Sequence, residues 1–426
     1  MEGYQKVYFI GIGGIGMSAL AQYLRECGIE VSGSDREETP VTEMLARKGI
    51  EVLIGQAAEN MPEDADAVVY SAAIWEDNPE RMCATELELP QFSYFEMLGK
   101  AAEGKRVIAV AGTHGKTTVT GMTARILRDA GTSPTAIVGS IVRDFESNYL
   151  AGNSDLFVVE ACEYRRHFLN LSPAVLVITN IEWDHTDYYH DLADFQSAFR
   201  ALMEKVPADG VIITNPTHPN IAPLLSGLSA PVIDYTKEPA YDVSLPGEFN
   251  QMNARAAAAA ARFVLPAIDE GTLHASLGEF KGTWRRFEFK GKSKNGAFVY
   301  DDYAHHPTAL KGTLAELRKR TGGRVIAAFH PHLYSRTRDL LDGFATAFVD
   351  ADMIAIAPIY PAREIDDGSV SSELLAERIR SNGQDAIALA SFDAIQEWFE
   401  KEGKEGDILV TLGAGDIYKV AEAIAV

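Results

Sequence analysis

The sequence has few cysteines and no long apolar run, and each shortage excludes a class of protein. Three cysteines, Cys27, Cys83 and Cys162, are too few and too scattered for a disulfide framework or a zinc site, and they suit a reducing compartment. No apolar stretch reaches the length of about 18 residues that a membrane-spanning helix needs, and the N-terminal segment lacks the apolar core of a signal peptide. We therefore expect a cytoplasmic protein without membrane insertion.

Positive charge is also scarce. The chain has 39 Lys and Arg against 61 Asp and Glu, which gives a net charge of −22. This balance argues against an extended nucleic-acid surface, so anionic ligands must meet local donors and metal ions. The 426 residues, of which 46% are apolar, suffice for about three domains with their own cores. The sequence does not define the oligomeric state.

Short β-rich apolar runs alternate with helical segments, which is typical of parallel sheets covered by helices on both faces. The predicted fold class is α/β with three domains: a Rossmann-like N-terminal domain at 1–104, a central P-loop ATPase-type domain at 105–283, and a Rossmann-like C-terminal domain at 284–426. Many of the apolar runs end in polar residues. Because ligands of open parallel sheets bind beyond the carboxyl ends of the strands, we expect the chemistry there.

A glycine-containing stretch of the central block follows an apolar run and precedes a helical segment; it comprises Gly112, Thr113, His114, Gly115, Lys116, Thr117 and Thr118. This is the pattern of a phosphate loop. Backbone amides close around phosphate oxygens, Lys116 adds a charge, and Thr117 offers a hydroxyl to magnesium. The pattern is shortened, since Val110 stands where a full P-loop has glycine. ATP chemistry is the first interpretation, and a glycine turn without a ligand is the alternative.

Two further residues of the central block are candidate metal ligands. Glu160 ends one apolar run, and His185 follows another. A carboxylate and an imidazole in these places could hold a divalent ion beside the triphosphate.

The first block opens with a second glycine motif directly after an apolar run: Gly11, Gly13, Gly14 and Gly16, with Asp35 at the end of the next run. This is the dinucleotide fingerprint, in which glycines admit a pyrophosphate and the acid meets a ribose hydroxyl. Alone it indicates an NAD-dependent dehydrogenase. A UDP-sugar also carries a pyrophosphate, so both ligands fit the motif.

The third block places histidines and an arginine after two apolar runs. Tyr303 and His305 follow the first run, and His332 and Arg336 follow the second. Such groups suit an anionic intermediate and a substrate carboxylate, which arginine can grip with two hydrogen bonds. A zinc site is the disfavoured alternative for the histidines, and a surface ion pair is the alternative for Arg336.

These motifs together resemble the Mur ligases of peptidoglycan precursor synthesis, and among them the alanine-adding branch. The resemblance covers essentially the whole chain and rests on nine segments in the family's order: GIGGIGMSALA, AGTHGKTT, VVEACE, TNIEWDH, WRRFE, DDYAHHPTAL, PHLYSRT, IYPARE and LGAGDIYKV.

The resemblance implies a reaction, its cofactors ATP and Mg²⁺, and its substrates UDP-N-acetylmuramate and L-alanine. ATP would phosphorylate the lactyl carboxylate, and the alanine amine would attack the resulting acyl phosphate. Peptidoglycan synthesis in the cytoplasm, with its effect on cell shape and division, would be the setting.

The resemblance also implies roles for individual residues. The UDP-sugar would meet the first glycine motif and Ser71; ATP would meet the phosphate loop, Asn250, Asn253, Arg286 and Asp302; magnesium would meet Thr117, Glu160 and His185; and the amino acid and intermediate would meet Tyr303, His305, His332 and Arg336. Lys116, Glu160, His185, His305, His332 and Arg336 would be the catalytic set.

The chain departs from the family pattern at two site positions. Phe249 stands where many alanine-adding members have histidine, and Leu333 stands where many have a second arginine of the amino-acid site. A ligase that adds a whole peptide and a non-catalytic nucleotide-binding regulator are the remaining alternatives.

Overall fold

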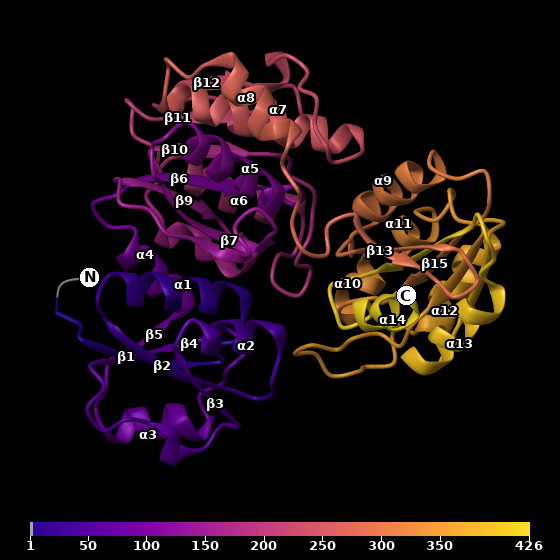
Figure 1. The fold of residues 1–426 in the computed structure, drawn as a ribbon, viewed down its shortest axis with the longest axis horizontal. Helices are drawn as coiled ribbons and strands as arrows, with labels where there is room; N and C mark the ends of the chain where they lie inside the picture. The colour runs from indigo at the N-terminus through magenta and orange to yellow at the C-terminus, as the bar shows by residue number, and fades with distance from the viewer. Residues whose placement is uncertain (1–2) are drawn as a thin grey trace. The chain divides into compact units, whose positions relative to one another are not determined.

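The computed structural model describes residues 3–426 and contains three β-sheets (Figure 1). The chain forms two compact units. The first comprises the chain up to Glu182 together with Gln196–Ser244 and Gln251–Gly282; the second comprises Trp183–Phe195, Leu245–Asn250 and Thr283–Val426. The first unit contains two of the sheets and the second contains the third. The predicted α/β class is confirmed.

The first sheet is parallel throughout and has the strand order β3-β2-β1-β4-β5. Buried apolar residues of β1 form its centre, as expected for a strand covered on both faces. The elements are β1 (Lys6–Ile10), α1 (Ile15–Glu26), β2 (Glu30–Asp35), α2 (Pro40–Arg47), β3 (Glu51–Ile54), the short helix η1 (Ala58–Asn60), β4 (Ala67–Tyr70), α3 (Pro79–Glu86), β5 (Gln91–Ser93) and α4 (Tyr94–Ala101).

The second sheet has the strand order β12-β11-β10-β6-β9-β7-β8, and only its last pair is antiparallel. Its strands are β6 (Arg106–Ala111), β7 (Thr135–Val142), β8 (Ser147–Leu150), β9 (Leu156–Glu160), β10 (Val175–Ile178), β11 (Val211–Thr214) and β12 (Val232–Asp234). Its helical segments are α5 (Lys116–Asp129), η2 (Tyr164–Asn170), α6 (Leu192–Met203), η3 (Ala222–Leu224), η4 (Tyr235–Lys237), α7 (Glu248–Val264) and α8 (Glu270–Gly278).

The two sheets of the first unit are joined through α1, which contacts both β7 and β8. Figure 1 shows α1 and α4 between the first sheet and the second. The helix that follows the first glycine motif therefore also packs against the sheet that bears the phosphate loop.

The third sheet has the order β13-β14-β18-β15-β16-β17, with only β13 antiparallel to its neighbour. Helices α9, α11 and α12 pack on one face, and α13 and α14 pack on the other. The elements are β13 (Glu288–Lys292), β14 (Phe298–Asp302), α9 (Pro307–Arg318), β15 (Val325–Phe329), α10 (Tyr334–Asp339), α11 (Leu341–Ala345), β16 (Met353–Ile356), α12 (Ser372–Ser381), β17 (Asp385–Ala388), α13 (Phe392–Glu402), β18 (Ile408–Leu412) and α14 (Tyr418–Ile424).

The strands expected from apolar runs are all present. Each of them has a neighbouring strand on both sides, and most of its residues are buried. Within residues 3–426, no helix is long and apolar enough to cross a membrane. The domain boundaries after residues 104 and 283 stay a prediction.

Candidate active site

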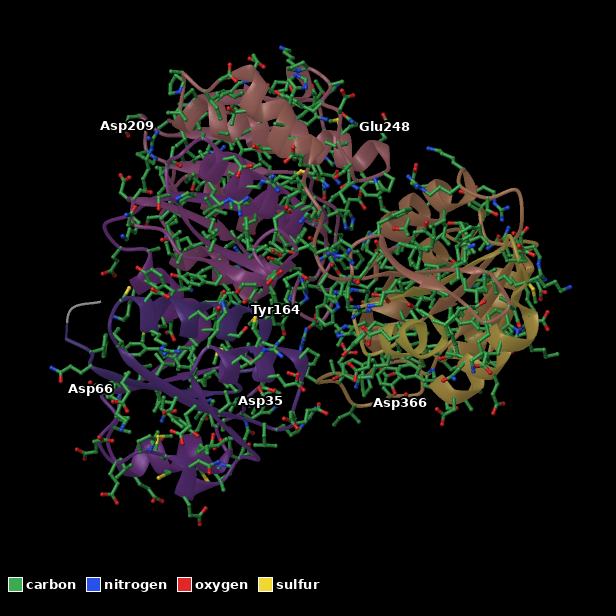
Figure 2. All side chains as sticks on the ribbon, in the orientation of Figure 1. Asp35, Asp66, Tyr164, Asp209, Glu248 and Asp366 are labelled. Carbon is green, nitrogen blue, oxygen red and sulfur yellow. The ribbon has the colours of Figure 1, made fainter. Side chains whose placement is uncertain are left out.

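The first glycine loop joins β1 to α1, and its backbone amides are held by the end of β2. The amides of Gly11 and Ile12 both donate to the carbonyl of Ser34 at 2.9 Å, and the Gly13 amide donates to Asp35 Oδ2 at 2.7 Å. Gly11 has a φ of 79°, and a Cβ atom on Gly13 would lie 2.8 Å from Asp35 Oδ2. Asp35, which is labelled in Figure 2, thus fastens the turn from the end of β2.

The other predicted UDP-sugar residues surround this loop. Gly14 is the N-cap of α1, so the positive end of the helix dipole faces the loop. Ser71 Cβ lies 3.2 Å from where a Cβ on Gly11 would be. Gly16 lies within α1, where a Cβ would come 2.6 Å from the Tyr94 ring. The structure therefore brings these residues together, and Gly16 also permits close packing of α1 against α4.

The phosphate loop lies between β6 and α5 and is fixed by the segment after β10. The Thr113 hydroxyl donates to the carbonyl of Glu182 at 2.9 Å, and the His114 amide donates to Asn180 Oδ1 at 2.9 Å. Gly112 and Gly115 have φ values of 129° and 84°. These left-handed conformations cost glycine little, which explains the residue type at both positions.

Lys116 is the first residue of α5, and its ammonium group is surrounded by oxygen. It donates to the carbonyls of Gly112 and Thr113 and to Glu163 Oε1, the last at 2.8 Å. Burial disfavours the charged lysine, but the nearby Glu163 and Glu160 outweigh burial and hold the pKa of Lys116 above its usual value. Lys116 is therefore a full positive charge at neutral pH.

Glu160 ends β9 beside the same helix. Thr117 Oγ1 donates to Glu160 Oε1 at 3.2 Å, and the Gly139 amide donates to Glu160 Oε2 at 2.8 Å. Two of the predicted metal ligands are thus adjacent. The third, His185, belongs to the second compact unit and is described with it.

The remaining predicted nucleotide residues of the central block lie on two helices. Thr118 is buried within α5. Asn253 of α7 lies against Gly115 of the phosphate loop: a Cβ atom added to Gly115 would clash with Asn253 Oδ1. Asn250, one turn earlier in α7, is 4% exposed and donates to the carbonyl of Pro246 at 2.7 Å. Phe249 beside it is 40% exposed.

In the second unit, Arg336 of α10 forms a buried ion pair. Its Nε donates to Asp184 Oδ1 at 2.7 Å, and its Nη1 lies 3.2 Å from His332 Nδ1. Burial would raise the pKa of Asp184, but Arg336 and the neighbouring histidines hold it well below its usual range. The alternative of a surface ion pair for Arg336 is wrong, because its side chain is only 3% exposed.

His332 and His305 beside this pair are uncharged at neutral pH. Burial and the charge of Arg336 lower the pKa of His332 to about 3 and hold the pKa of His305 well below its usual value. His305 Nδ1 lies 2.9 Å from the carbonyl of Tyr303. Arg336 therefore adds a positive charge beside two neutral imidazoles, each of which keeps one N–H that can donate to an anion. That His305 and His332 contact the amino acid and the intermediate stays a prediction.

His185 follows Asp184 with a φ of 53°, and its amide donates to Asp184 Oδ1 at 2.7 Å. Leu333, which precedes α10, has a φ of 72° and is fully buried. Non-glycine residues in this conformation store strain, and strained residues gather at functional sites. The positions of both residues support the choice of this cluster as a functional site.

Asp302 and Arg286 lie near Tyr303. Asp302 accepts the amides of Phe287 at 2.6 Å and Ala304 at 2.7 Å, one on each carboxylate oxygen. Burial raises the pKa of Asp302 to about 6, against the charge of Arg286. The guanidinium carbon of Arg286 lies 4.8 Å from the centre of the Tyr303 ring. Asp302 thus fixes the backbone that presents Arg286.

Sequence reasoning missed three charged residues that complete these groups: Glu163, Asp184 and Arg285. Arg285 is buried and pairs with Asp301 at 2.9 Å. Each of them lies in one of the segments that resemble the Mur ligases (VVEACE, TNIEWDH and WRRFE). The sequence of a segment does not predict which cation pairs with which carboxylate.

Family models match three consecutive parts of the chain. They are the Mur ligase family catalytic domain at residues 6–106, the Mur ligase middle domain at 110–242 and the Mur ligase glutamate ligase domain at 285–415. The chain belongs to the Mur ligase family. Membership accounts for both glycine loops, and the dehydrogenase alternative accounts only for the first.

Individual relatives agree with this assignment. A UDP-N-acetylmuramate--L-alanine ligase of Clostridium novyi is 40% identical over 446 residues, which cover 98% of this Mur ligase and 96% of the relative. The relative of the same name from Lachnospira eligens is 40% identical, with coverage of 98% and 97%. The crystal structure of UDP-N-acetylmuramate-alanine ligase from Thermotoga maritima matches with a TM-score of 0.80 at 28% identity and covers 98% of both chains.

Proposed function

We propose that this Mur ligase joins L-alanine to the lactyl carboxylate of UDP-N-acetylmuramate at the expense of ATP. The observation that carries the proposal is the 40% identity, over 98% of the chain, to ligases with that named activity. The reaction has two steps. The carboxylate takes the γ-phosphoryl group of ATP and becomes an acyl phosphate, and the alanine amine then displaces phosphate to form the amide.

The phosphate loop is the proposed site of ATP. Phosphoryl transfer depends mainly on positioning and charge neutralisation, and the buried ammonium of Lys116 supplies both at the loop. A γ-phosphate would compete with Glu163 and the loop carbonyls for this ammonium. Asn253, Asn250, Arg286 and Asp302 are the proposed contacts to the rest of the nucleotide.

Magnesium fits the residues beside Lys116. Thr117 Oγ1 and Glu160 Oε1 are 3.2 Å apart, and hydroxyl and carboxylate oxygens are the donors that magnesium prefers. A bound ion would neutralise charge on the phosphates. We keep His185 as a proposed third ligand.

The first glycine loop is the proposed site of the UDP pyrophosphate. Its backbone is fastened by Asp35, it lies at the N-terminus of α1, and Ser71 adjoins it. Asp35 is also a proposed contact to the UDP-sugar.

The cluster of Arg336, His332 and His305 is the proposed site of the amino acid and the intermediate. Arg336 uses Nε and Nη1 for Asp184 and His332, and Nη2 takes no part in those two contacts. We assign Nη2 to the alanine carboxylate. The neutral imidazoles can form hydrogen bonds with the attacking amine, although their low pKa values make them weak acceptors of its proton.

A peptide-adding activity is the second candidate. It is favoured by the likeness to a murein peptide ligase from Psychrobacter arcticus, with a TM-score of 0.75 at 25% identity and coverage of 99% and 100%. Leu333, which is buried, stands where many alanine-adding members have a second arginine of the amino-acid site. Its presence makes selectivity for alanine as the acceptor less secure.

The test is phosphate release by the purified protein with ATP and magnesium, with UDP-N-acetylmuramate and L-alanine added singly and together, and mass spectrometry of the product. Release that requires both, with the mass of the alanyl product, is expected. Product with a tripeptide and none with alanine would instead favour the second candidate. Bound ATP without product from any acceptor would indicate a regulator.

A further inference from the structure

A buried polar network joins the first glycine loop's helix to the hairpin β7–β8 (Thr135–Leu150). Asn148 of β8 is its centre: Nδ2 donates to the carbonyl of Ile15 at 2.5 Å and to Ser18 Oγ at 2.8 Å, and Oδ1 accepts from Gln22 Nε2 at 3.0 Å. Ile15 is the first residue of α1. Asn148 therefore fastens the helix end that faces the proposed pyrophosphate.

The network extends to α2 through a single lysine. Lys48, the C-cap of α2, donates from Nζ to Gln22 Oε1 at 2.7 Å and to Ser147 Oγ at 3.4 Å. Ser147 also donates to Gln22 Oε1 at 3.1 Å. Asn148, Ser147 and Ser18 are fully buried. Polar groups without solvent need their partners, so the network specifies one arrangement of α1 on the hairpin.

The other strand of the hairpin reaches the proposed magnesium site. In β7, Ile137 pairs with Tyr149 of β8 on one side and with Val159 of β9 on the other. Glu160 follows Val159, and the β7 amide of Gly139 donates to its Oε2 at 2.8 Å. One hairpin thus contacts the helix end of the first loop and a carboxylate beside the second.

We propose that the β7–β8 hairpin is a positioning element that sets the first glycine loop against the phosphate loop, with Asn148 as its principal positioning residue. This inference rests on the proposed function, in which the lactyl carboxylate of one ligand must attack the γ-phosphorus of the other. Asn148 touches neither reacting atom; it acts through α1.

The network should affect turnover and not the binding of either ligand. Each loop is built from its own strand and helix, so each keeps its ligand when the network is cut. The in-line approach of carboxylate to phosphorus depends on the placement of both, and a small misplacement lowers the rate strongly. Loss of the network should therefore lower kcat and leave the two separate affinities unchanged.

The experiment compares Asn148→Ala and Lys48→Met with the wild-type protein. Titration calorimetry gives the affinities for UDP-N-acetylmuramate and for a non-hydrolysable ATP analogue, and steady-state assays give kcat. Exchange of ¹⁸O from the β,γ-bridge of ATP, with UDP-N-acetylmuramate and without alanine, reports acyl-phosphate formation alone. We expect exchange and kcat to fall by about 10- to 100-fold in Asn148→Ala, with a smaller fall in Lys48→Met, at unchanged affinities.

Asn382→Ala is the matched control, because Asn382 also donates from Nδ2 to two carbonyls, those of Ala345 at 3.1 Å and Arg378 at 3.2 Å, but lies at the end of α12. It should show wild-type exchange. Wild-type exchange in Asn148→Ala, or parallel loss of affinity and rate, would overturn the inference. If Asn148→Ala does not fold, Lys48→Met decides, because Lys48 is at the exposed edge of the network. Absence of exchange in the wild-type protein would overturn the proposed function itself.

Discussion

The two glycine loops of the first unit share the order strand, loop, helix, and they differ in the charged side chain that contacts the loop backbone, an acid in the first and a lysine in the second. Each joins a central parallel strand to a helix, β1 to α1 and β6 to α5. The first loop is fastened by an acid, Asp35, and the helix after it has no acidic residue in its first turn and begins without a lysine. The second begins its helix with Lys116, between Glu163 and the carbonyls of the loop. In the proposed function, glycines let both loops approach a phosphate closely. The charged residue beside each loop then distinguishes a loop that only binds a pyrophosphate from one that supports phosphoryl transfer.

Lys116→Met should have the largest effect of the substitutions in the two loops, because it removes the lysine charge from the second loop. We expect turnover to fall by about a thousandfold or more, with the affinity for UDP-N-acetylmuramate unchanged. Phosphate release and calorimetry measure the two effects. Lys237→Met, at a side chain that is 82% exposed, is the control. A variant that retains turnover would show that the second loop is not the site of phosphoryl transfer.

Gly13→Ala should disrupt the first loop alone. The added methyl would lie 2.7 Å from Thr42 Cγ2 and 2.8 Å from Asp35 Oδ2, so the turn must shift. We expect the KM for UDP-N-acetylmuramate to rise about tenfold or more, and the affinity for the ATP analogue to stay constant. Gly322→Ala, where no atom lies within 4 Å, should behave as wild type. Equal weakening of both ligands would contradict the separation of the loops.

Glu163→Gln should change how the second loop responds to pH. Glu163 helps to hold the pKa of Lys116 above 10.5, so the stabilisation from this pair is present below that pH and is lost as pH rises further. Without the carboxylate, the alkaline limb of the rate profile should move to lower pH, and kcat at neutral pH should fall about tenfold. A pH–rate profile measured from pH 7 to above pH 10 would reveal either shift, and an unmoved alkaline limb would argue against this role for Glu163.

Asp35→Asn should have the smallest effect. The amide oxygen can still accept from the Gly13 amide, so the loop keeps this hydrogen bond. The charge and the second acceptor, which receives the Arg36 amide, are lost. We expect a change of about threefold or less in KM for UDP-N-acetylmuramate, whereas Asp35→Ala should cost more because the Gly13 amide loses its partner. Steady-state kinetics of the two variants measure the difference. Identical KM values for both variants would mean that this hydrogen bond does not hold the loop.

The glycine loops and the buried strands could be predicted from the sequence because their signals are local. Gly11 and Gly112 follow apolar runs directly, and such runs are buried wherever helices cover both faces of a sheet. The short strands β3 and β5 are harder to predict, because they have only four and three residues and lie at the edges of the first sheet.

The pairing of charges could not be predicted in the same way. Lys116 meets Glu163 across 47 positions, and Arg336 meets Asp184 across 152. Such pairs depend on which strand ends the tertiary fold brings together. The adjacent His305 and His306 show the same limit: His306 accepts the amide of Thr308 as the N-cap of α9, whereas His305 turns toward Tyr303.

The low pKa of His332, about 3, has a consequence for titration experiments. Between pH 5 and 8 this imidazole and that of His305 therefore stay neutral. The contribution of these two imidazoles to the electric field at an incoming amino acid is then the same throughout this interval. A dependence of acceptor binding on pH in that range therefore reports other groups, either the ligand or Asp302 with its pKa of about 6, and the two imidazoles serve as a fixed reference when different acceptors are ranked.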